Sequence, residues 1–181
     1  AGRRLLVYTG NCDRRQGLRE LLQAMPLVLR HHPDAALVVV GGEPGEVARL
    51  QALADELGVR ADVRLIGRRP PVTMAEYMGM AEVLISPRQE PYATPLKIFS
   101  YMASGRPIVA TDLPTHTVVL DRESAILVPP SPEGLADGLE RALREPERAL
   151  ELGRRAARLV GEKYTYELFQ RRLVEAYEAI L

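Results

Sequence analysis

The sequence has few of the residues that form disulfides and hold metals. Its 181 residues include one cysteine, Cys12, and three histidines, scattered along the chain. A single cysteine excludes an internal disulfide and indicates a reducing compartment. So few thiol and imidazole groups argue against a zinc site, and we expect no metal.

Net charge and long apolar runs are missing as well. The chain carries 24 basic and 24 acidic side chains, so it offers no bulk attraction to nucleic acid or to an anionic membrane, and any anion site must be local. No apolar run approaches the ~18 residues of a spanning helix, and the start lacks the apolar core of a signal peptide. We therefore expect a cytoplasmic protein with no nucleic-acid partner. The missing initial Met suggests a piece of a longer protein.

Short apolar runs alternate with helical stretches along most of the chain. The expected strands are Leu5–Thr9, Ala36–Val40, Val63–Ile66, Val83–Ser86, Ile108–Ala110 and Ala125–Val128. The expected helices are Leu18–Leu29, Glu46–Leu57, Thr73–Met80, Pro95–Ala103, Pro132–Arg144, Pro146–Glu162 and Tyr166–Leu181. Thr73 and Glu76 have the spacing of a capping box.

Strands that are apolar throughout and separated by helices indicate right-handed βαβ units in a sheet covered on both faces. The sequence thus predicts the α/β class, with a Rossmann-like, doubly wound, six-stranded parallel sheet and C-terminal helices. Because no flexible linker or repeat interrupts it, we expect residues 1–181 to form one domain with a helical tail from about residue 131 to 181.

Ligands bind such folds at the carboxyl ends of the strands, so the loops that follow the strands hold the candidate sites. The first loop lies between Gly10 and Gly17, and its amides could receive phosphate, although an ordinary βα loop has the same composition. Gly41 and Gly42 allow either a close ligand or a plain tight turn. Neither G-x-G-x-x-G nor a Walker A motif is present, so a dinucleotide or P-loop site has little support.

The loop from Ser86 to Lys97 is the most informative. We expect Thr94 to cap the next helix and Pro95 to begin it, so that free amides and the helix dipole form an anion site. Arg88 and Lys97 add positive charge, and Lys97 is one of two lysines among 24 basic residues, which suggests a specific requirement. A solvated lysine on a helix surface is the alternative.

His116 follows the fifth strand and could face a ligand or cap the next helix; a structural role is slightly favoured. The loops after the first, second and fourth strands then give three candidate anion sites on one edge of the sheet, with no nucleophile–base pair. This pattern favours a nucleotide-diphosphate binder over a hydrolase.

The segment from Pro95 to Asp112, PLKIFSYMASGRPIVATD, resembles the donor-site segment of group 1 (family 4) retaining glycosyltransferases. Further matches, in the family's order, are Gly10…Gln16-Gly17, Gly41-Gly42, Ile66-Gly67 and Leu127-Val128-Pro129-Pro130. The resemblance covers essentially the whole chain and implies the C-terminal, nucleotide-sugar-binding half of a GT-B fold. It is closest to a subgroup associated with bacterial exopolysaccharide synthesis.

Four positions depart from the family pattern. Ser100 stands where the second of two glutamates is expected to hydrogen-bond the donor ribose, and Glu90 matches the first only with a longer loop. Asn11 and Gln16 stand where an arginine and a lysine bind the diphosphate. The open candidates to replace that pair are Arg14, Arg15, Arg88 and Lys97.

The resemblance implies the donor half of an enzyme that moves a sugar from a UDP- or GDP-sugar to a glycan or lipid-linked acceptor without a metal. The implied catalytic residues are Glu90, Lys97 and Arg88. The implied donor-binding residues are Gly10, Asn11, Arg15, Gln16, Gly17, Gly42, Arg68, Thr94, Pro95, Leu96 and Ser100.

The resemblance also implies that an N-terminal acceptor domain is absent, so that this chain alone should bind the donor and transfer little. Any peripheral contact with a membrane would come through that missing half. A terminal helix such as Tyr166–Leu181 often packs on the other domain in this family, which would leave an apolar patch here. The alternatives that stay open are a non-catalytic nucleotide-sugar binding module and half of a nucleotide-sugar epimerase.

Overall fold

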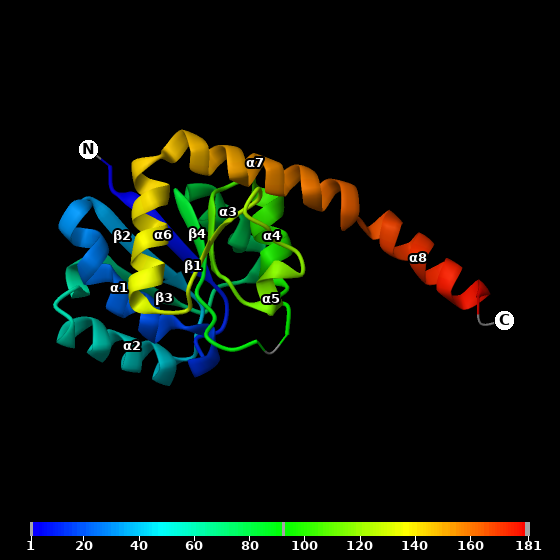
Figure 1. Ribbon diagram of the computed structural model, residues 1–181. Helices are drawn as coiled ribbons and strands as arrows, with labels where there is room; N and C mark the ends of the chain where they lie inside the picture. The colour runs from blue at the N-terminus through cyan, green and yellow to red at the C-terminus, as the bar shows by residue number, and fades with distance from the viewer. Residues whose placement is uncertain (1, 92, 180–181) are drawn as a thin grey trace.

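A six-stranded parallel sheet lies at the centre of the computed structural model, which describes residues 2–91 and 93–179 (Figure 1). The strands are β1 (Arg4–Thr9), β2 (Ala35–Val40), β3 (Val63–Gly67), β4 (Val83–Ser86), β5 (Ile108–Thr111) and β6 (Ile126–Val128). Their spatial order is β3-β2-β1-β4-β5-β6, and all five pairings are parallel. The predicted Rossmann-like, doubly wound sheet is confirmed, and the connections change direction between β1 and β4.

Helices cover both faces of this sheet, which is why the strands are apolar throughout rather than alternating. The helices are α1 (Leu18–His31), α2 (Pro44–Glu56), α3 (Met74–Met80), α4 (Lys97–Ser104), α5 (Pro114–Thr117), α6 (Pro132–Arg144), α7 (Pro146–Lys163) and α8 (Tyr166–Glu178). One core packs α1, α2 and α6 on the sheet through residues such as Leu21 and Leu139. The opposite core holds α4 and α7, with Tyr101 and Ala156 fully buried.

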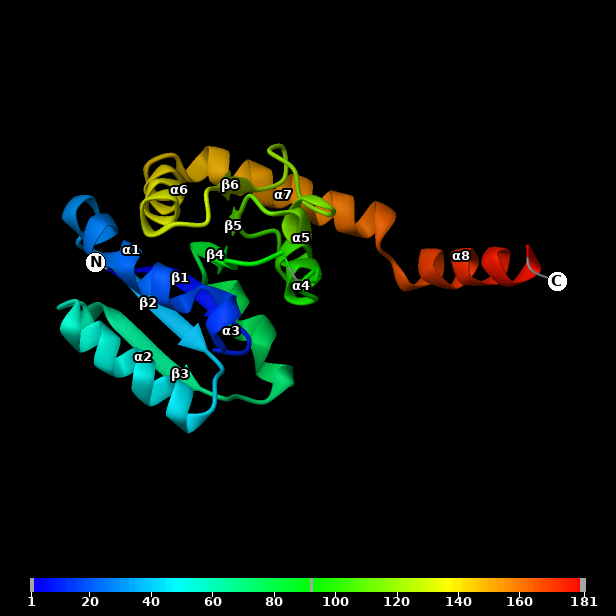
Figure 2. The same ribbon diagram turned by 60° about the horizontal axis from the view of Figure 1, so that its bottom comes forward.

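The C-terminal helices differ in how they meet this body. In Figure 2, α6 and α7 lie along it, in keeping with the packing of α6 on α1 and of α7 on α4. In both ribbon views α8 extends away from the body, and none of its described residues is buried. The last two residues of the helix expected over Tyr166–Leu181 lie outside the described residues. No described helix combines the length and hydrophobicity needed to span a bilayer.

The start of α4 differs from the prediction. The helix begins at Lys97, because the carbonyls of Pro95 and Leu96 accept tighter, three-residue hydrogen bonds from the amides of Ile98 (3.0 Å) and Phe99 (3.2 Å). No side chain caps this helix, so the expected role of Thr94 as its cap is wrong. The first helical side chain is therefore the lysine itself.

Two other helix starts also differ. The Thr73 hydroxyl donates to the Pro70 carbonyl (2.8 Å) within a 3₁₀ turn and does not cap α3, so the predicted capping box is absent. In α2 the Glu46 carboxylate accepts a hydrogen bond from the Glu43 amide (2.9 Å), which supports a helix start at Pro44, ahead of the expected Glu46. Local hydrogen bonds rather than apolar periodicity decided both boundaries.

Candidate functional site

The loops after β1 and β4 face each other at the point where the sheet connections change direction, which is where such folds bind ligands. Gly10 directly follows β1, and Lys97 opens α4. A Cβ atom at Gly10 would lie 3.1 Å from the Lys97 Nζ, and the Gly10 φ of +132° also disfavours other residues. Glycine therefore leaves the room that the lysine side chain occupies.

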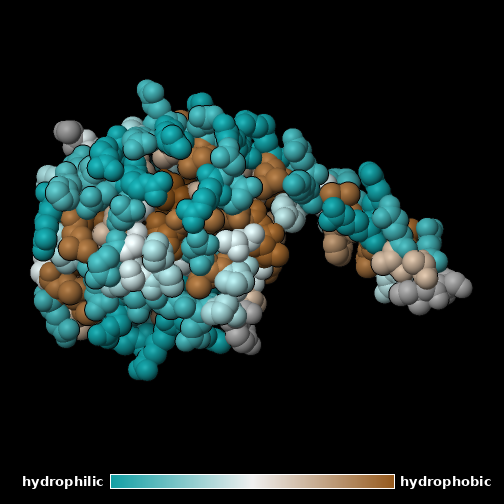
Figure 3. Space-filling view, in the orientation of Figure 1, coloured by the Kyte–Doolittle hydropathy of each residue, from teal (hydrophilic) through white to brown (hydrophobic). Residues whose placement is uncertain are grey.

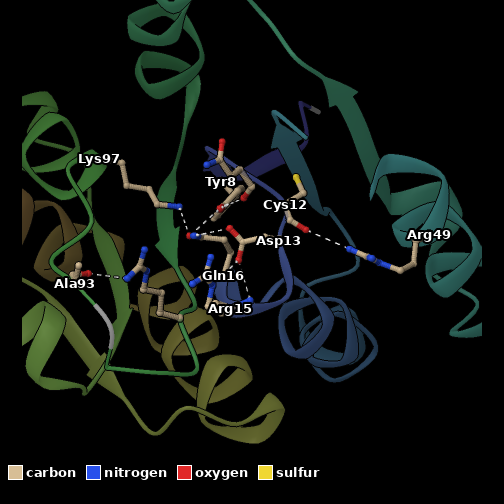
Figure 4. Close-up of polar contacts among 10 residues, drawn as sticks. Tyr8, Cys12, Asp13, Arg15, Gln16, Arg49, Ala93 and Lys97 are labelled. Carbon is tan, nitrogen blue, oxygen red and sulfur yellow. Dashed lines mark hydrogen bonds and ion pairs between the residues drawn. The ribbon is translucent and has the colours of Figure 1, made fainter. Parts of the chain in front are cut away.

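The Lys97 ammonium lies among neutral partners. Its Nζ is 3.7 Å from the centroid of the Tyr8 ring and 3.4 Å from Oε1 of Gln16 (Figure 4). Burial, and then the positive charge of Arg88, lower the pKa of Lys97 to about 7. None of the ion pairs among the described residues includes Lys97 or Arg88. The cation is thus partly dehydrated without a carboxylate partner, and an anionic ligand would stabilise it.

Gln16 lies in a short 3₁₀ turn and is buried. Its Nε2 donates to Oδ2 of Asp13 (3.3 Å), so its carbonyl oxygen faces the Lys97 ammonium and the Tyr8 hydroxyl (3.3 Å). The Tyr8 hydroxyl in turn donates to the backbone carbonyl of Asn11. Tyr8 and Gln16 thereby contact the lysine of α4, and Asp13 fixes the Gln16 amide.

Arg88 supplies the second cation of the site. Its Nη1 donates to the Ala93 carbonyl (2.6 Å), which shapes the loop before α4, while its buried Nε has no partner among the described residues. The Thr111 hydroxyl holds the Arg88 backbone carbonyl (2.7 Å). A buried donor without an acceptor among the described residues, beside a partly dehydrated ammonium, is a further feature that suits an anion.

His116 is fully buried and does not reach the surface of the site. Its Nδ1 donates to the Thr111 carbonyl (2.8 Å), and its Nε2 accepts from the Ser86 hydroxyl (2.9 Å). Burial lowers the pKa of His116 to about 4, so the ring is neutral. The structure supports a structural role for His116, because its ring forms hydrogen bonds with the ends of both β4 and β5.

A cleft of about 490 Å³ opens beside Gly10, over the carboxyl ends of β1, β2 and β3. It contains the predicted donor-binding residues Gly10, Asn11, Gly42 and Arg68. Arg68 forms an exposed ion pair with Glu43 (2.8 Å) at its rim. Gly10 therefore borders both the cleft and the group of Tyr8, Asp13, Gln16 and Lys97 (the Lys97 cluster), and the two form adjoining parts of one candidate site.

The other predicted site residues lie around these two parts. Glu90, Leu96 and Ser100 are exposed, Thr94 is half-buried and Pro95 is buried. Arg15 lies 3.5 Å from Asp13 through its Nε. Gly17 is packed closely against the β4 loop, and a Cβ atom there would overlap the Pro87 carbonyl. Pro95 has no amide hydrogen, so the amides at this helix start come from the residues after it.

The sequence did not single out Tyr8 and Asp13, which complete the Lys97 cluster. Tyr8 belongs to an apolar strand run, and Asp13 is one of several polar residues in the loop after it. A large aromatic residue near the end of β1, two positions before Gly10, is the one local signal for this arrangement. Within the described part of the chain no group of three or more Cys, His, Asp or Glu side chains is placed to hold a metal.

A family model described as "Glycosyl transferases group 1" matches residues 3–145, most of the chain and all six strands of the sheet. The chain belongs to the group 1 glycosyltransferase family. It is 30% identical to the phosphatidyl-myo-inositol mannosyltransferase of Mycobacterium tuberculosis, over 97% of this chain and 47% of that protein. The chain spans less than half the length of the curated relatives it matches.

Solved structures of this group share the fold. Anabaena Alr3699/HepE, solved in complex with UDP, superposes with a TM-score of 0.89 at 16% identity, covering 99% of this chain and 50% of that one. The C-terminal domain of a group 1 glycosyltransferase from Francisella tularensis superposes with a TM-score of 0.80 at 20% identity, covering 91% and 88% of the two chains. The Rossmann-like sheet described above is thus that of GT-B glycosyltransferases.

Proposed function

We propose that this chain is the donor-binding half of a retaining glycosyltransferase, which moves a sugar from a UDP- or GDP-sugar to a glycan or lipid-linked acceptor. The observation that carries the proposal is the Lys97 ammonium, which lies beside Arg88 at the switch point of the sheet and forms no ion pair with any described residue. A diphosphate would supply both cations with a negatively charged partner and with oxygens that accept their hydrogen bonds.

The proposed roles of Lys97 and Arg88 follow from the negative charge that develops on the leaving group during sugar transfer. Sugar transfer breaks the bond between the anomeric carbon and a diphosphate oxygen, so negative charge grows on the departing diphosphate. Cations fixed before the reaction stabilise that charge without reorganisation. Lys97 and Arg88 would act in this way, with no metal required, and the exposed Glu90 would contact the donor sugar.

The cleft beside Gly10 would take the nucleoside part of the donor. Gly42 lines this cleft, and Arg68 at the rim would border the base and ribose. Ser100 lies one helical turn after Lys97, so its hydroxyl would offer a neutral contact where the family pattern has a carboxylate.

The relatives support this assignment. The mycobacterial relative is a mannosyltransferase by name, and the Anabaena neighbour was solved with UDP. The full enzyme would retain the anomeric configuration, take its acceptor on a second domain and serve polysaccharide synthesis. A nucleotide-sugar epimerase would instead form product without any acceptor, and a non-catalytic module would bind donor without turnover in the longer protein.

Titration calorimetry with UDP and GDP tests the proposal. We expect Lys97→Gln to weaken binding of the preferred nucleotide by about tenfold or more, because a charge-assisted contact contributes about 1.5–3 kcal/mol. The matched control is Lys163→Gln at the end of α7, the only other lysine of the chain. Equal affinity of Lys97→Gln and wild-type protein would refute the assignment, as would binding of neither nucleotide.

A further inference from the structure

The contact between Gln16 and Lys97 joins two segments 81 residues apart and brings a neutral acceptor to a dehydrated ammonium. Gln16 is 7% exposed and its amide is fixed by Asp13, so it presents oxygen to the lysine, and it is not among the residues that line the cleft. This differs from the expectation that Gln16 binds the donor directly.

We propose that Gln16 is a positioning residue, which aims the Lys97 ammonium at the diphosphate and does not itself bind the diphosphate. The proposal rests on the proposed function above and deepens it. In this arrangement α4 supplies the ammonium and the β1 loop supplies the acceptor that holds it in place.

The groups around the Lys97 ammonium do not neutralise its positive charge. On β1 it lies over the Tyr8 ring, and the charged or titratable groups that act on it are Cys12 and Asp13 of the β1 loop and Arg88 of the β4 loop. Burial raises the pKa of Tyr8 well above its ordinary value and that of Cys12 to about 11, so both stay neutral. The Asp13 carboxylate is occupied by Gln16 and by the amide of Arg15 (3.0 Å). The neutral carbonyl of Gln16 therefore fixes the position of the ammonium without neutralising its charge.

The same geometry predicts that the lysine and the glutamine can exchange places. Their polar ends meet at 3.4 Å. A lysine side chain is one bond longer than a glutamine side chain, so a lysine at position 16 would place its ammonium close to the present position of the Lys97 Nζ. A glutamine at position 97 would then supply the carbonyl that holds it.

The experiment compares wild-type protein with Lys97→Gln, Gln16→Met and the double variant Gln16→Lys with Lys97→Gln. Binding of UDP-glucose, GDP-mannose and inorganic pyrophosphate is measured by calorimetry, and folding is checked by thermal melting. In protein with ¹³Cε-labelled lysine, two signals report the two lysines, and their titration with pH reads the lysine pKa directly. Lys163 is the internal reference.

We expect the double variant to recover most of the affinity that Lys97→Gln loses, to within about threefold of wild type. We expect Gln16→Met to weaken binding and to lower the pKa of Lys97 further, since the ammonium loses its acceptor. The signal of the lysine at position 97, or at position 16 in the double variant, should shift when the probe is added.

The outcomes separate this inference from the proposed function. If neither nucleotide sugar binds but pyrophosphate shifts the Lys97 signal and the exchange restores pyrophosphate binding, the inference stands and the donor assignment fails. If a donor binds and Lys97→Gln weakens it, but the folded double variant restores nothing, Gln16 is not a positioning residue. A Gln16→Met protein that melts normally, with unchanged Lys97 pKa and affinity, overturns the inference as well.

Discussion

Buried polar side chains connect the site to the sheet, and His116 links two strand ends through a single neutral ring. Its ordinary pKa is 6.5, and in the folded chain the pKa is about 4. The unfolded chain therefore takes up this proton at higher pH than the folded chain does. The stabilising contribution is complete above about pH 6.5 and is lost as pH falls toward 4, by about 3 kcal/mol in total.

Urea unfolding of wild-type protein and His116→Gln, each at about pH 7.5 and about pH 4, checks this prediction. The variant cannot take up the proton, so its free energy of unfolding should fall by about 3 kcal/mol less than that of wild type over this range. Carboxylates that titrate over the same range are common to both proteins and cancel in the comparison. An equal fall in the two proteins would show that His116 does not carry this pH dependence.

Among the elements, the close approach of the β1 loop to the β4 loop depends on Gly17. Its φ is +74°, and a Cβ atom would lie 1.7 Å from the carbonyl oxygen of Pro87. We expect Gly17→Ala to lower the free energy of unfolding by about 3 kcal/mol or more, from backbone strain and overlap together. Thermal melting and urea titration measure this loss.

Gly58 provides the matched control for that substitution. It also has a left-handed φ, +68°, but nothing lies within 4 Å of a Cβ atom there. Gly58→Ala should therefore cost only the backbone term, about 1–2 kcal/mol. If Gly17→Ala were no less stable than Gly58→Ala, the β4 loop would move away from residue 17 at little cost in free energy. Because Gln16 precedes residue 17, a measurement of donor binding would then show whether Gln16 has shifted.

Most elements of this fold follow from local chemistry, which the sequence displays. Each predicted strand boundary lies within one residue of the observed one, because a buried parallel strand is a continuous apolar run bounded by polar or turn residues. The start of α4 does not follow, since hydrogen bonds to the Pro95 and Leu96 carbonyls delay it. The contact between Lys97 and Gln16 depends on how distant loops meet, and local pattern carries no information about that.

For the molecule as a whole, the most unusual feature is α8, which leaves the body with its apolar residues uncovered. Tyr166, Phe169, Val174 and Tyr177 are each more than half exposed, and Figure 3 shows apolar surface along the projecting helix. Most of the hydrophobic residues of the body are packed in two cores. An amphipathic helix that buries none of its described residues gains little stability from its own chain.

We therefore predict that the chain binds donor but transfers little. The proposed anion site lies within the α/β body, so nucleotide binding should be intact, whereas acceptor recognition would come from a second domain and from the face that α8 would cover. Mass spectrometry of UDP-glucose or GDP-mannose incubated with the chain and a glycan or lipid-linked acceptor should find no acceptor-linked product, while calorimetry detects binding. A longer protein containing this chain should transfer the sugar with retained configuration. Turnover by the 181-residue chain itself would show that the donor half is sufficient. Epimerised nucleotide sugar, identified by proton NMR in a reaction without acceptor, would assign the chain to the epimerases.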